Sequence, residues 1–414
     1  MIVITIKKVN MEAPMKKFIQ QQLAKLNDKP FSPRADVFWH NLRKTGTEIW
    51  LDTGDIEEAS SIWSSEMSGL TTNNTLLNKE IQKGIYDNMV VEASKLLNDK
   101  DTEEKIKDIA FALNAIHGAR LVKIFGARVS VELHTDLADD IEGIIQYGKR
   151  FHDIDPLHFI VKVPYTASGL IGARELSKAG IPVNITLGFS ARQNLLAAVI
   201  SKPQYVNVFL GRINAYVTNN KLGSGKLLGE KVTLASQKTI IKHAGDTVKQ
   251  IAASIRHFNQ LISLAGTHVF TIPTKVAKEG RKKLKAEFVD STAISYTITL
   301  DGDNTPENTG LDKLWEIPGE LTELVGQMRE NTPVEGEQLE EIFRANGFTD
   351  MFPYLTKKEK NRIAKDGKIP VHEHWTNRFS TNEIAVDTLL NKAGLASFTA
   401  DQLELDERIR RIIS

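Results

Sequence analysis

Eight short apolar runs recur between residues 48 and 275, and longer segments with helical periodicity separate most of them. The runs are Glu48–Asp52, Ser68–Thr72, Arg128–Leu133, His158–Val163, Pro182–Gly188, Tyr205–Leu210, Gln250–Arg256 and His268–Ile272. The helical patterns include Leu76–Asn98, Glu103–Leu121, Ala167–Ala179 and a segment that Ser190 begins as an N-cap. Strands that alternate with helices pair in parallel, because each helix returns the chain to the starting edge of the sheet. This count predicts an α/β protein with a closed (β/α)8 TIM barrel, and a doubly wound open sheet is the alternative.

The sequences that flank this pattern are of a different kind. Residues 14–28 predict an amphipathic N-terminal helix. Beyond residue 275 the chain is richer in charge and is interrupted by prolines, so we expect helices and loops there. Thr399–Gln402 has the form of a capping box and predicts that the last helix begins there. We therefore expect three parts: an N-terminal helical segment (1–44), a catalytic barrel (45–299) and an extended, mainly helical C-terminal region packed on it (300–414).

The composition restricts the chemistry. The 414 residues include 53 basic and 52 acidic side chains and no cysteine, which excludes disulfides, thiol nucleophiles and cysteine-held metals. A near-zero net charge argues against a dedicated nucleic-acid binder. The apolar start at Ile2–Ile6 is too short for a signal sequence, and no stretch has the length of a membrane span. We expect a cytoplasmic protein with no metal, no cofactor, no nucleic acid and no membrane among its partners.

Polar side chains share one parity along the predicted strands. Successive side chains of a strand point to opposite faces, so Ser130 and Glu132 oppose an apolar set in their strand. Polar positions of the same kind in other strands are Asp52, Lys162, Asn184, Thr186 and Asn207. They lie toward the carboxyl ends of their strands, where barrel enzymes build active sites. Any one of them could be an interior polar group whose hydrogen bonds are satisfied, but the whole set on one parity predicts a pocket.

Lys162 is the most informative of these residues. A lysine inside an apolar strand is costly unless its charge is paired or removed, and a neutral amine attacks carbonyl groups. The alternative is a lysine whose ammonium reaches water at the strand end. Asp52 and Glu132 come from other strands on the same parity. One lysine and two carboxylates meet the needs of Schiff-base chemistry without a metal, although the carboxylates could also only neutralise the lysine.

Six stretches in register resemble the transaldolase family, a class I, Schiff-base-forming family of aldolase barrels. They are Trp50–Asp55, Gly69–Asn74, Val129–Glu132, Val161–Leu170, Gly180–Ser190 and Phe209–Ile213. The resemblance covers residues from about 45 to 275. It implies transfer of a dihydroxyacetone unit from a ketose phosphate, sedoheptulose 7-phosphate or fructose 6-phosphate, to glyceraldehyde 3-phosphate or erythrose 4-phosphate, in the pentose phosphate pathway.

The resemblance also implies a role for each matching residue. Lys162 is similar to the lysine that forms the Schiff base, and Asp52 to the acid/base for carbon–carbon cleavage. Glu132, with a water held by Thr186, resembles the proton shuttle. The expected substrate-binding residues are Asn73, Asn184, Asn207, Phe209, Arg212 and Arg256, of which the two arginines resemble phosphate ligands.

Three features leave the outcome of the reaction open. Phe209 is similar to the transaldolase phenylalanine, where the related fructose 6-phosphate aldolases carry tyrosine. Asn74 and Asn207 depart from the family's proline and serine. The C-terminal region matches poorly, and only Leu395–Gln402 in it resembles the family's closing helix. A fructose 6-phosphate aldolase-like or specialised sugar aldolase is therefore the alternative, and a non-catalytic barrel homologue is a third interpretation. We expect sugar phosphates as substrates and a homodimer as the oligomeric state.

Overall fold

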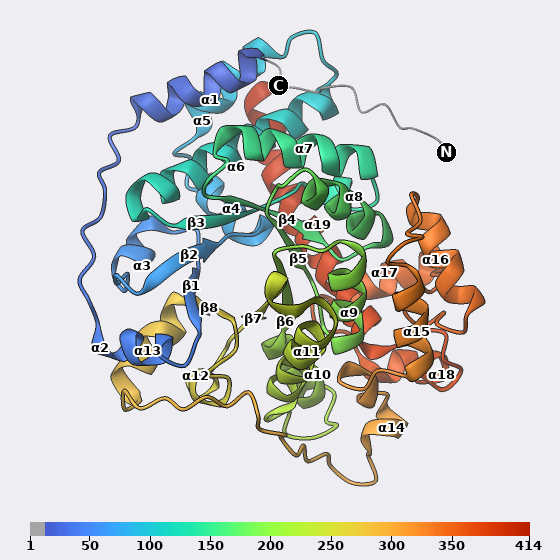
Figure 1. Ribbon diagram of the computed structural model, residues 1–414. Helices are drawn as coiled ribbons and strands as arrows, with labels where there is room; N and C mark the ends of the chain where they lie inside the picture. Colours follow the sequence, from blue (N-terminus) through green and yellow to red (C-terminus); the bar gives the residue numbers. More distant parts are fainter. Residues whose placement is uncertain (1–12) are drawn as a thin grey trace.

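The computed structural model describes residues 13–414, and its centre is a closed parallel barrel (Figure 1). The strands follow one another around the barrel in chain order. They are β1 Glu48–Asp52, β2 Met67–Thr71, β3 Arg128–Glu132, β4 Phe159–Pro164, β5 Val183–Thr186, β6 Tyr205–Phe209, β7 Lys249–Ala253 and β8 Val269–Pro273. Each coincides with one predicted run to within a few residues. The predicted (β/α)8 barrel is therefore confirmed, and the open sheet is wrong. The apolar run Ile2–Ile6 lies outside the described residues.

Helices follow the strands around the outside of the barrel. They are α3 Ile56–Ser60, α4 Asn74–Gln82, α5 Asp87–Leu96, α6 Thr102–Phe125, α7 Ile141–Ile154, α8 Ala167–Lys178, α9 Ala191–Ile200, α10 Leu210–Asn219, α11 Leu228–Ala244, α12 Gln260–Ser263 and α13 Thr274–Lys283, with 3₁₀ turns η1 Thr135–Leu137 and η2 Gly245–Thr247. The Ser190 hydroxyl accepts a hydrogen bond from the Gln193 amide, so the predicted N-cap of α9 is confirmed.

The prediction of one helix over Leu76–Asn98 is wrong. The chain breaks between α4 and α5, where Gly84 adopts a φ of 78°. A left-handed residue cannot continue an α-helix, and glycine takes this conformation without steric cost. The apolar periodicity continues on both sides of the break, which is why the pattern did not indicate it.

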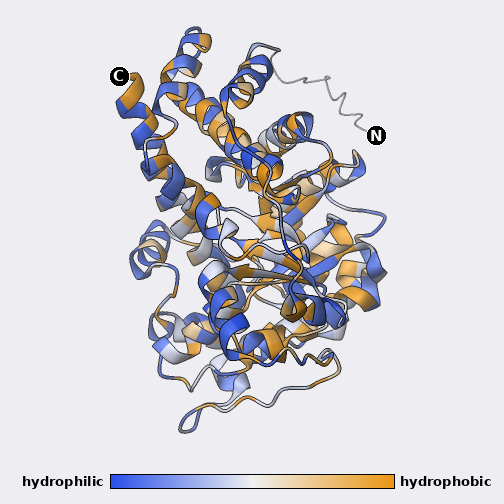
Figure 2. Cartoon of the chain, turned by 90° about the vertical axis from the view of Figure 1, so that its left-hand side faces the viewer, coloured by the Kyte–Doolittle hydropathy of each residue, from blue (hydrophilic) through white to orange (hydrophobic). Residues whose placement is uncertain are grey.

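The barrel interior and its contact with the helices form the hydrophobic core. Figure 2 shows hydrophobic residues concentrated in the central strands, whereas the surrounding helices alternate between apolar and polar positions. Every residue of β4, β5 and β6 is buried. Gly69 illustrates the close packing, because a Cβ there would lie 2.7 Å from the ring of Trp50. Only glycine at this position leaves room for the fully buried indole.

In the described part of the chain, two helices precede the barrel. α1 (Ala13–Lys25) corresponds to the predicted N-terminal helix and packs against α5 and α6. α2 (Val37–Arg43) was not predicted. The Asp36 carboxylate caps it by accepting from the Phe38 amide, and Trp39 and Leu42 bury its inner face. The helix has fewer than two full periods, which is too short for a periodic pattern to be recognised.

The C-terminal region is helical, as predicted. Its elements are α14 Pro306–Thr309, η3 Asp312–Leu314, α15 Gly319–Gln327, α16 Gly336–Ala345, α17 Lys357–Asp366, η4 His372–Trp375, α18 Thr376–Ser380 and α19 Val386–Ile413. The elements from α14 to α18 gather at one side of the barrel, where α15 contacts α9 and α16 contacts α8 (Figure 1). α19 instead runs back to the barrel and packs against α4, α5 and α6.

The prediction that Thr399 begins the last helix is wrong. Thr399 lies in the middle of α19, which begins at Val386. A capping box requires an extended residue at the N-cap position. The residues before Thr399 are leucine, alanine and other helix-compatible types, so nothing interrupts the helix there.

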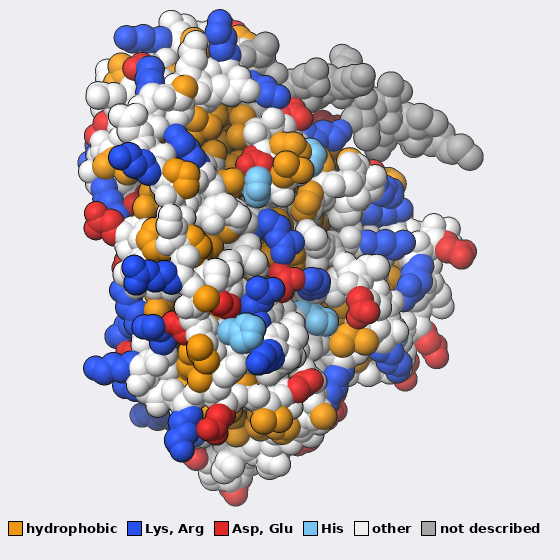
Figure 3. All heavy atoms as spheres, turned by 60° about the vertical axis from the view of Figure 1, so that its left-hand side comes forward, with side chains coloured by type: hydrophobic (Ala, Val, Ile, Leu, Met, Phe, Trp, Pro, Cys, Tyr) orange, Lys and Arg blue, Asp and Glu red, His pale blue; other side chains and the backbone are white. Residues whose placement is uncertain are grey.

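Charged side chains of both signs are spread over the face of the molecule in Figure 3, and apolar side chains occur among them in small groups. This distribution accords with the formal net charge of +1. In residues 13–414, no helix is both long and apolar enough to cross a membrane.

Candidate active site

A cavity of about 310 Å³ opens at the carboxyl end of the barrel strands. Its wall is formed by strand ends, by residues that follow β2 and β7, and by α19. Seven of the ten residues predicted from the sequence line it: Asp52, Asn73, Lys162, Asn184, Asn207, Phe209 and Arg212. Glu132, Thr186 and Arg256 lie outside the lining.

Lys162 projects from β4 into this cavity and is almost completely buried, with 4% of its surface exposed. The strand register sets Glu132, Lys162 and Asn184 side by side on β3, β4 and β5. The Lys162 ammonium donates to the Thr72 carbonyl oxygen at 3.0 Å and to Glu132 Oε2 at 3.2 Å. The lysine is therefore paired inside the barrel and does not reach out to bulk water.

Glu132 sits behind the lysine. Burial raises the pKa of its carboxyl group, and the neighbouring Lys162 charge opposes that rise. The main-chain N–H of Asn74 also favours the charged carboxylate. On its other side Glu132 borders a small, mainly apolar space that His134 and Gln402 also line. A carboxyl group with a raised pKa beside an amine is suited to exchanging protons.

Asp52 ends β1 at the opposite side of the cavity. The Thr71 hydroxyl lies 2.9 Å from Asp52 Oδ1 and 2.6 Å from the Thr271 hydroxyl. Burial raises the pKa of Asp52, while Lys162 and the Thr71 hydrogen bond lower it. Asp52 is thus a carboxyl group held in a fixed orientation and poised to accept or return a proton.

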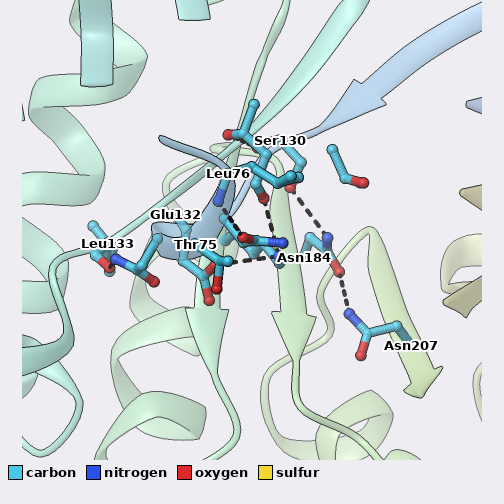
Figure 4. A network of polar contacts seen from close by, with 12 residues as sticks. Thr75, Leu76, Ser130, Glu132, Leu133, Asn184 and Asn207 are labelled. Carbon is cyan, nitrogen blue, oxygen red and sulfur yellow. Dashed lines mark hydrogen bonds and ion pairs between the residues drawn. The ribbon is translucent and has the colours of Figure 1, made fainter. Parts of the chain in front are cut away.

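Two amide side chains of the cavity lining, Asn184 and Asn207, belong to one network of polar contacts (Figure 4). Asn184 Nδ2 donates to the Ser130 hydroxyl at 3.1 Å, and Asn207 Nδ2 donates to Asn184 Oδ1 at 3.3 Å. Asn73 begins α4 as its N-cap, accepting from the Leu76 amide at 2.8 Å. These bonds fix the orientation of each amide and leave other donor and acceptor sites for hydroxyl groups.

Thr186 is buried near the end of β5, and its hydroxyl has no partner in the described part of the chain. A buried hydroxyl without a partner is costly unless water or a ligand satisfies it. A water molecule or a ligand atom would therefore satisfy this hydroxyl.

The two predicted arginines come close together from different elements. The Arg212 guanidinium lies in the cavity wall, and its Nη1 is buried with no partner among residues 13–414. Burial and the nearby Arg256 charge lower its pKa to about 10. Arg256 is more exposed, and its side-chain stem crosses Gly211, where a Cβ would approach it to 2.8 Å. Two cations with few protein partners are suited to binding a dianion.

The closing wall of the cavity comes from the far end of the sequence. The Phe398 ring of α19 lies 5.8 Å from the Lys162 ammonium and 5.4 Å from the Arg212 guanidinium. Asn74 Nδ2 donates to Gln402 Oε1 at 2.7 Å, and the Thr75 hydroxyl donates to Asp401. The middle of α19 is thereby attached to the beginning of α4.

A buried charge network, which we call the latch, holds the beginning of α19. Arg192 donates to both carboxylate oxygens of Asp387 at 2.8 Å and to Asp350 at 3.0 Å. Ser190 donates to Asp387 at 2.6 Å, and Lys313 donates to Asp350 at 2.8 Å. The latch joins α9 of the barrel to α19 and to the C-terminal helices.

Sequence reasoning missed several residues of this site. Thr71 lies within a stretch that carries the family resemblance, and Phe398 and Asp401 lie within Leu395–Gln402, which resembles the family's closing helix. These stretches could have indicated them. Lys368, which also lines the cavity, follows α17 and has no signal in the sequence.

Fold and cavity together define a (β/α)8 barrel protein whose candidate site occupies the end where such barrels carry their active sites. The sequence model of the transaldolase/fructose-6-phosphate aldolase family matches residues 49–308, and the chain belongs to this family.

Curated relatives agree with this assignment. A probable transaldolase of Thermus thermophilus is 35% identical over 236 residues, which cover 56% of this chain and 89% of the relative. A probable transaldolase of Dictyostelium discoideum is 26% identical over 288 residues, covering 66% and 88%. A transaldolase of Protochlamydia amoebophila is 28% identical over 246 residues, covering 57% and 75%.

Proposed function

We propose that the protein is a transaldolase that carries a dihydroxyacetone unit on Lys162. The observation on which the proposal chiefly depends is the Lys162 amine, buried in the cavity and 3.2 Å from Glu132 Oε2, with Asp52 in the same cavity. The donors are ketose phosphates, namely sedoheptulose 7-phosphate or fructose 6-phosphate. The acceptors are the aldose phosphates glyceraldehyde 3-phosphate or erythrose 4-phosphate.

In the first half of the proposed reaction, the Lys162 nitrogen attacks the C2 carbonyl carbon of the ketose. The resulting carbinolamine loses its hydroxyl group as water and becomes an imine. Glu132 delivers the proton for this loss through a water molecule that the unpartnered Thr186 hydroxyl holds. Asp52 then takes the proton of the C4 hydroxyl, the C3–C4 bond breaks, and the aldose phosphate leaves. The electron pair of that bond remains on Lys162 as an enamine.

In the second half, the enamine carbon attacks the aldehyde of the acceptor, and Asp52 returns its proton to the new hydroxyl. Water then releases the product ketose from Lys162. Asn73, Asn184 and Asn207 bind the hydroxyl groups of the three-carbon unit. Arg212 and Arg256 bind the phosphate, because two guanidinium groups with free donors match its oxygens.

Phe209 favours transfer over release of free dihydroxyacetone. A phenyl ring has no proton to give, so it leaves the enamine available to the acceptor. The aldolase-like alternative is motivated by Asn207, which stands where the family has a serine. Its side chain donates to Asn184 and accepts from the Gly188 amide. Product analysis with and without erythrose 4-phosphate separates the two: free dihydroxyacetone formed without acceptor supports the aldolase.

The decisive experiment is borohydride trapping with fructose 6-phosphate, followed by peptide mass spectrometry. Sugar should be found on Lys162, and Lys162→Met should abolish the label. Lys368→Met is the matched control, because it removes the other lysine of the cavity lining and should leave the label in place. An unlabelled wild-type chain refutes the Schiff base and supports a non-catalytic barrel. Equal labelling of Lys162→Met refutes the assignment of the Schiff base to Lys162.

We further propose that the reaction belongs to cytoplasmic pentose phosphate metabolism, needs no cofactor or metal, and takes place in a homodimer. We also propose that residues 45–299 are the catalytic domain, 1–44 an N-terminal helical segment, and 300–414 an extension whose last helix completes the site.

A further inference from the structure

A second cavity, of about 330 Å³, lies where the C-terminal ends of α8 and α9 meet the residues that follow α15. It shares no lining residue with the catalytic cavity. α8 and α9 run back from the carboxyl ends of β4 and β5, so their last turns lie at the opposite end of the barrel from the catalytic cavity. Thus it is not a branch of the candidate active site.

Four cations line this second cavity: Arg174, Lys178, Lys202 and Arg329. None of the described residues that line it is acidic, although Glu175, outside the lining, pairs with Lys178. Ser177, Ser201 and Thr332 supply the polar remainder of the lining. A concave surface with several cationic groups and no carboxylate attracts anions, because each cation adds to the same local potential.

The two arginines and Lys202 keep most of their donors uncommitted, whereas Ser201 and Thr332 donate to main-chain carbonyl oxygens. Arg174 and Lys202 make no ion pair or side-chain hydrogen bond with any residue in the range 13–414. Arg329 uses one guanidinium nitrogen, which donates to the His243 carbonyl at 2.7 Å. The Ser177 hydroxyl oxygen is buried and has no partner in that range. The protein therefore leaves donors here that an anion with several oxygens would satisfy.

The C-terminal end of α8 accounts for only one of the four cations, because a cation in the last turn of a helix is favourable by itself. Lys178 stands in the last turn of α8, where a cation is favourable by itself, and it pairs with Glu175 at 2.7 Å. Arg329 belongs to neither α8 nor α9 and comes from beyond residue 308, where the family match ends. Lys202 stands just after α9 with a φ of 46°, in the left-handed region where glycine is usual. Cations from three separate segments thus converge on one space.

We propose that this cavity binds a small compound with two phosphate groups, such as a bisphosphate or a pyrophosphate-containing molecule. Arg174 and Arg329 present planar donor forks that match phosphate oxygens, and Lys202 supplies a point charge. Arg174, Lys202 and Arg329, which no carboxylate among residues 13–414 pairs, offset much of the charge of two phosphates. The volume lies within the range of small-molecule sites. A bound ligand would join α8 and α9 to the C-terminal region.

The test is calorimetric titration of the full chain with inorganic pyrophosphate. Titrations are made in the Arg256→Gln background as well, so that binding at the catalytic cavity is measured separately. We expect binding that survives Arg256→Gln and weakens at least tenfold in the double variant Arg174→Gln/Lys202→Gln. The matched control is Lys357→Gln/Lys360→Gln, which removes two exposed charges from α17 and should leave the affinity unchanged.

Three results would overturn the proposal. They are no binding to the wild-type chain at millimolar pyrophosphate, unchanged binding in Arg174→Gln/Lys202→Gln, and an equal loss in the control variant. Activity is not read in this experiment, so its outcome is independent of the proposed transaldolase reaction.

Discussion

Replacing Asp387 by asparagine removes one charge from the latch without changing the shape of the side chain. Asp387 is fully buried and accepts two hydrogen bonds from Arg192 and one each from Ser190 and the Thr388 amide. In the native network the charges of Arg192 and Lys313 balance those of Asp350 and Asp387. After Asp387→Asn, one buried positive charge lacks a counterion.

The cost follows from that imbalance. Removing one partner of a buried ion pair costs about 3–5 kcal/mol, because the remaining charge stays desolvated. Asp350 still accepts from Arg192 at 3.0 Å, so we expect the lower end of the range, about 3 kcal/mol. Urea unfolding followed by tryptophan fluorescence measures this loss as a lower midpoint at an unchanged slope.

Two variants control the measurement. Arg192→Met/Asp387→Leu removes the whole pair, and it should be more stable than Asp387→Asn because no charge is left alone. Glu103→Gln breaks the exposed pair with Arg410 and should change the midpoint little. A loss below about 1 kcal/mol for Asp387→Asn would refute the argument that this charge is uncompensated, since that is the scale of an exposed pair.

The same network has a pH signature. Burial raises the pKa of Asp387, but Arg192, Ser190 and the Thr388 amide outweigh it, so the folded-state pKa lies below the ordinary 3.8. The stability that this group contributes is therefore present above pH 3.8 and is lost as the pH falls through the lower folded-state value. Acid titration of wild type and Asp387→Asn should show their stabilities converging in that window.

Three further variants test the site. Asn74 is the first residue of α4, a position where proline is tolerated, and its main-chain N–H favours the charged form of Glu132. Asn74→Pro removes this N–H, so the acid limb of the kcat/KM profile should move to higher pH. Asn74→Ala keeps the N–H and should leave the acid limb in place. Thr71→Val removes a hydrogen bond that lowers the pKa of Asp52, so it should also move the acid limb to higher pH. An unchanged pH–rate profile would contradict this expectation. Phe398→Ala removes the ring beside Arg212 and should raise KM for phosphorylated substrates about three- to tenfold, with a smaller effect on kcat; equal loss on unphosphorylated sugars would show a merely structural role.

The strands and their functional side chains were predictable because two local rules determine them. Alternation along a strand assigns Glu132 and Lys162 to the interior, and the register of adjacent parallel strands then makes them neighbours. Helix boundaries depended on more distant contacts. The residues at Thr399 match a capping pattern, yet Thr399 lies inside α19, because the residues before and after it are both helical. Local signals could not reveal this continuity.

The wall of the cavity was not predictable in the same way. Phe398 and Asp401 reach the site only because α19 crosses the barrel at one particular angle and position, which the latch and the contacts with α4 determine. Lys368 depends on the same placement. Spacing within the sequence does not give the position of this crossing. Only the resemblance of Leu395–Gln402 to the family's closing helix could have indicated Phe398 and Asp401, and no sequence signal indicated Lys368.

The attachment of α19 to α4 has a consequence for the order of folding. The Asn74–Gln402 and Thr75–Asp401 hydrogen bonds join residues 328 and 326 positions apart, whereas Glu132 and Lys162 are separated by only 30. Closing such a long loop costs more chain entropy than pairing neighbouring strands, and contacts of high sequence separation form late. Neighbouring strands and their lysine–carboxylate pair can therefore assemble first, before β1 pairs with β8 and before α19 docks. The cavity gains its last wall only when α19 docks.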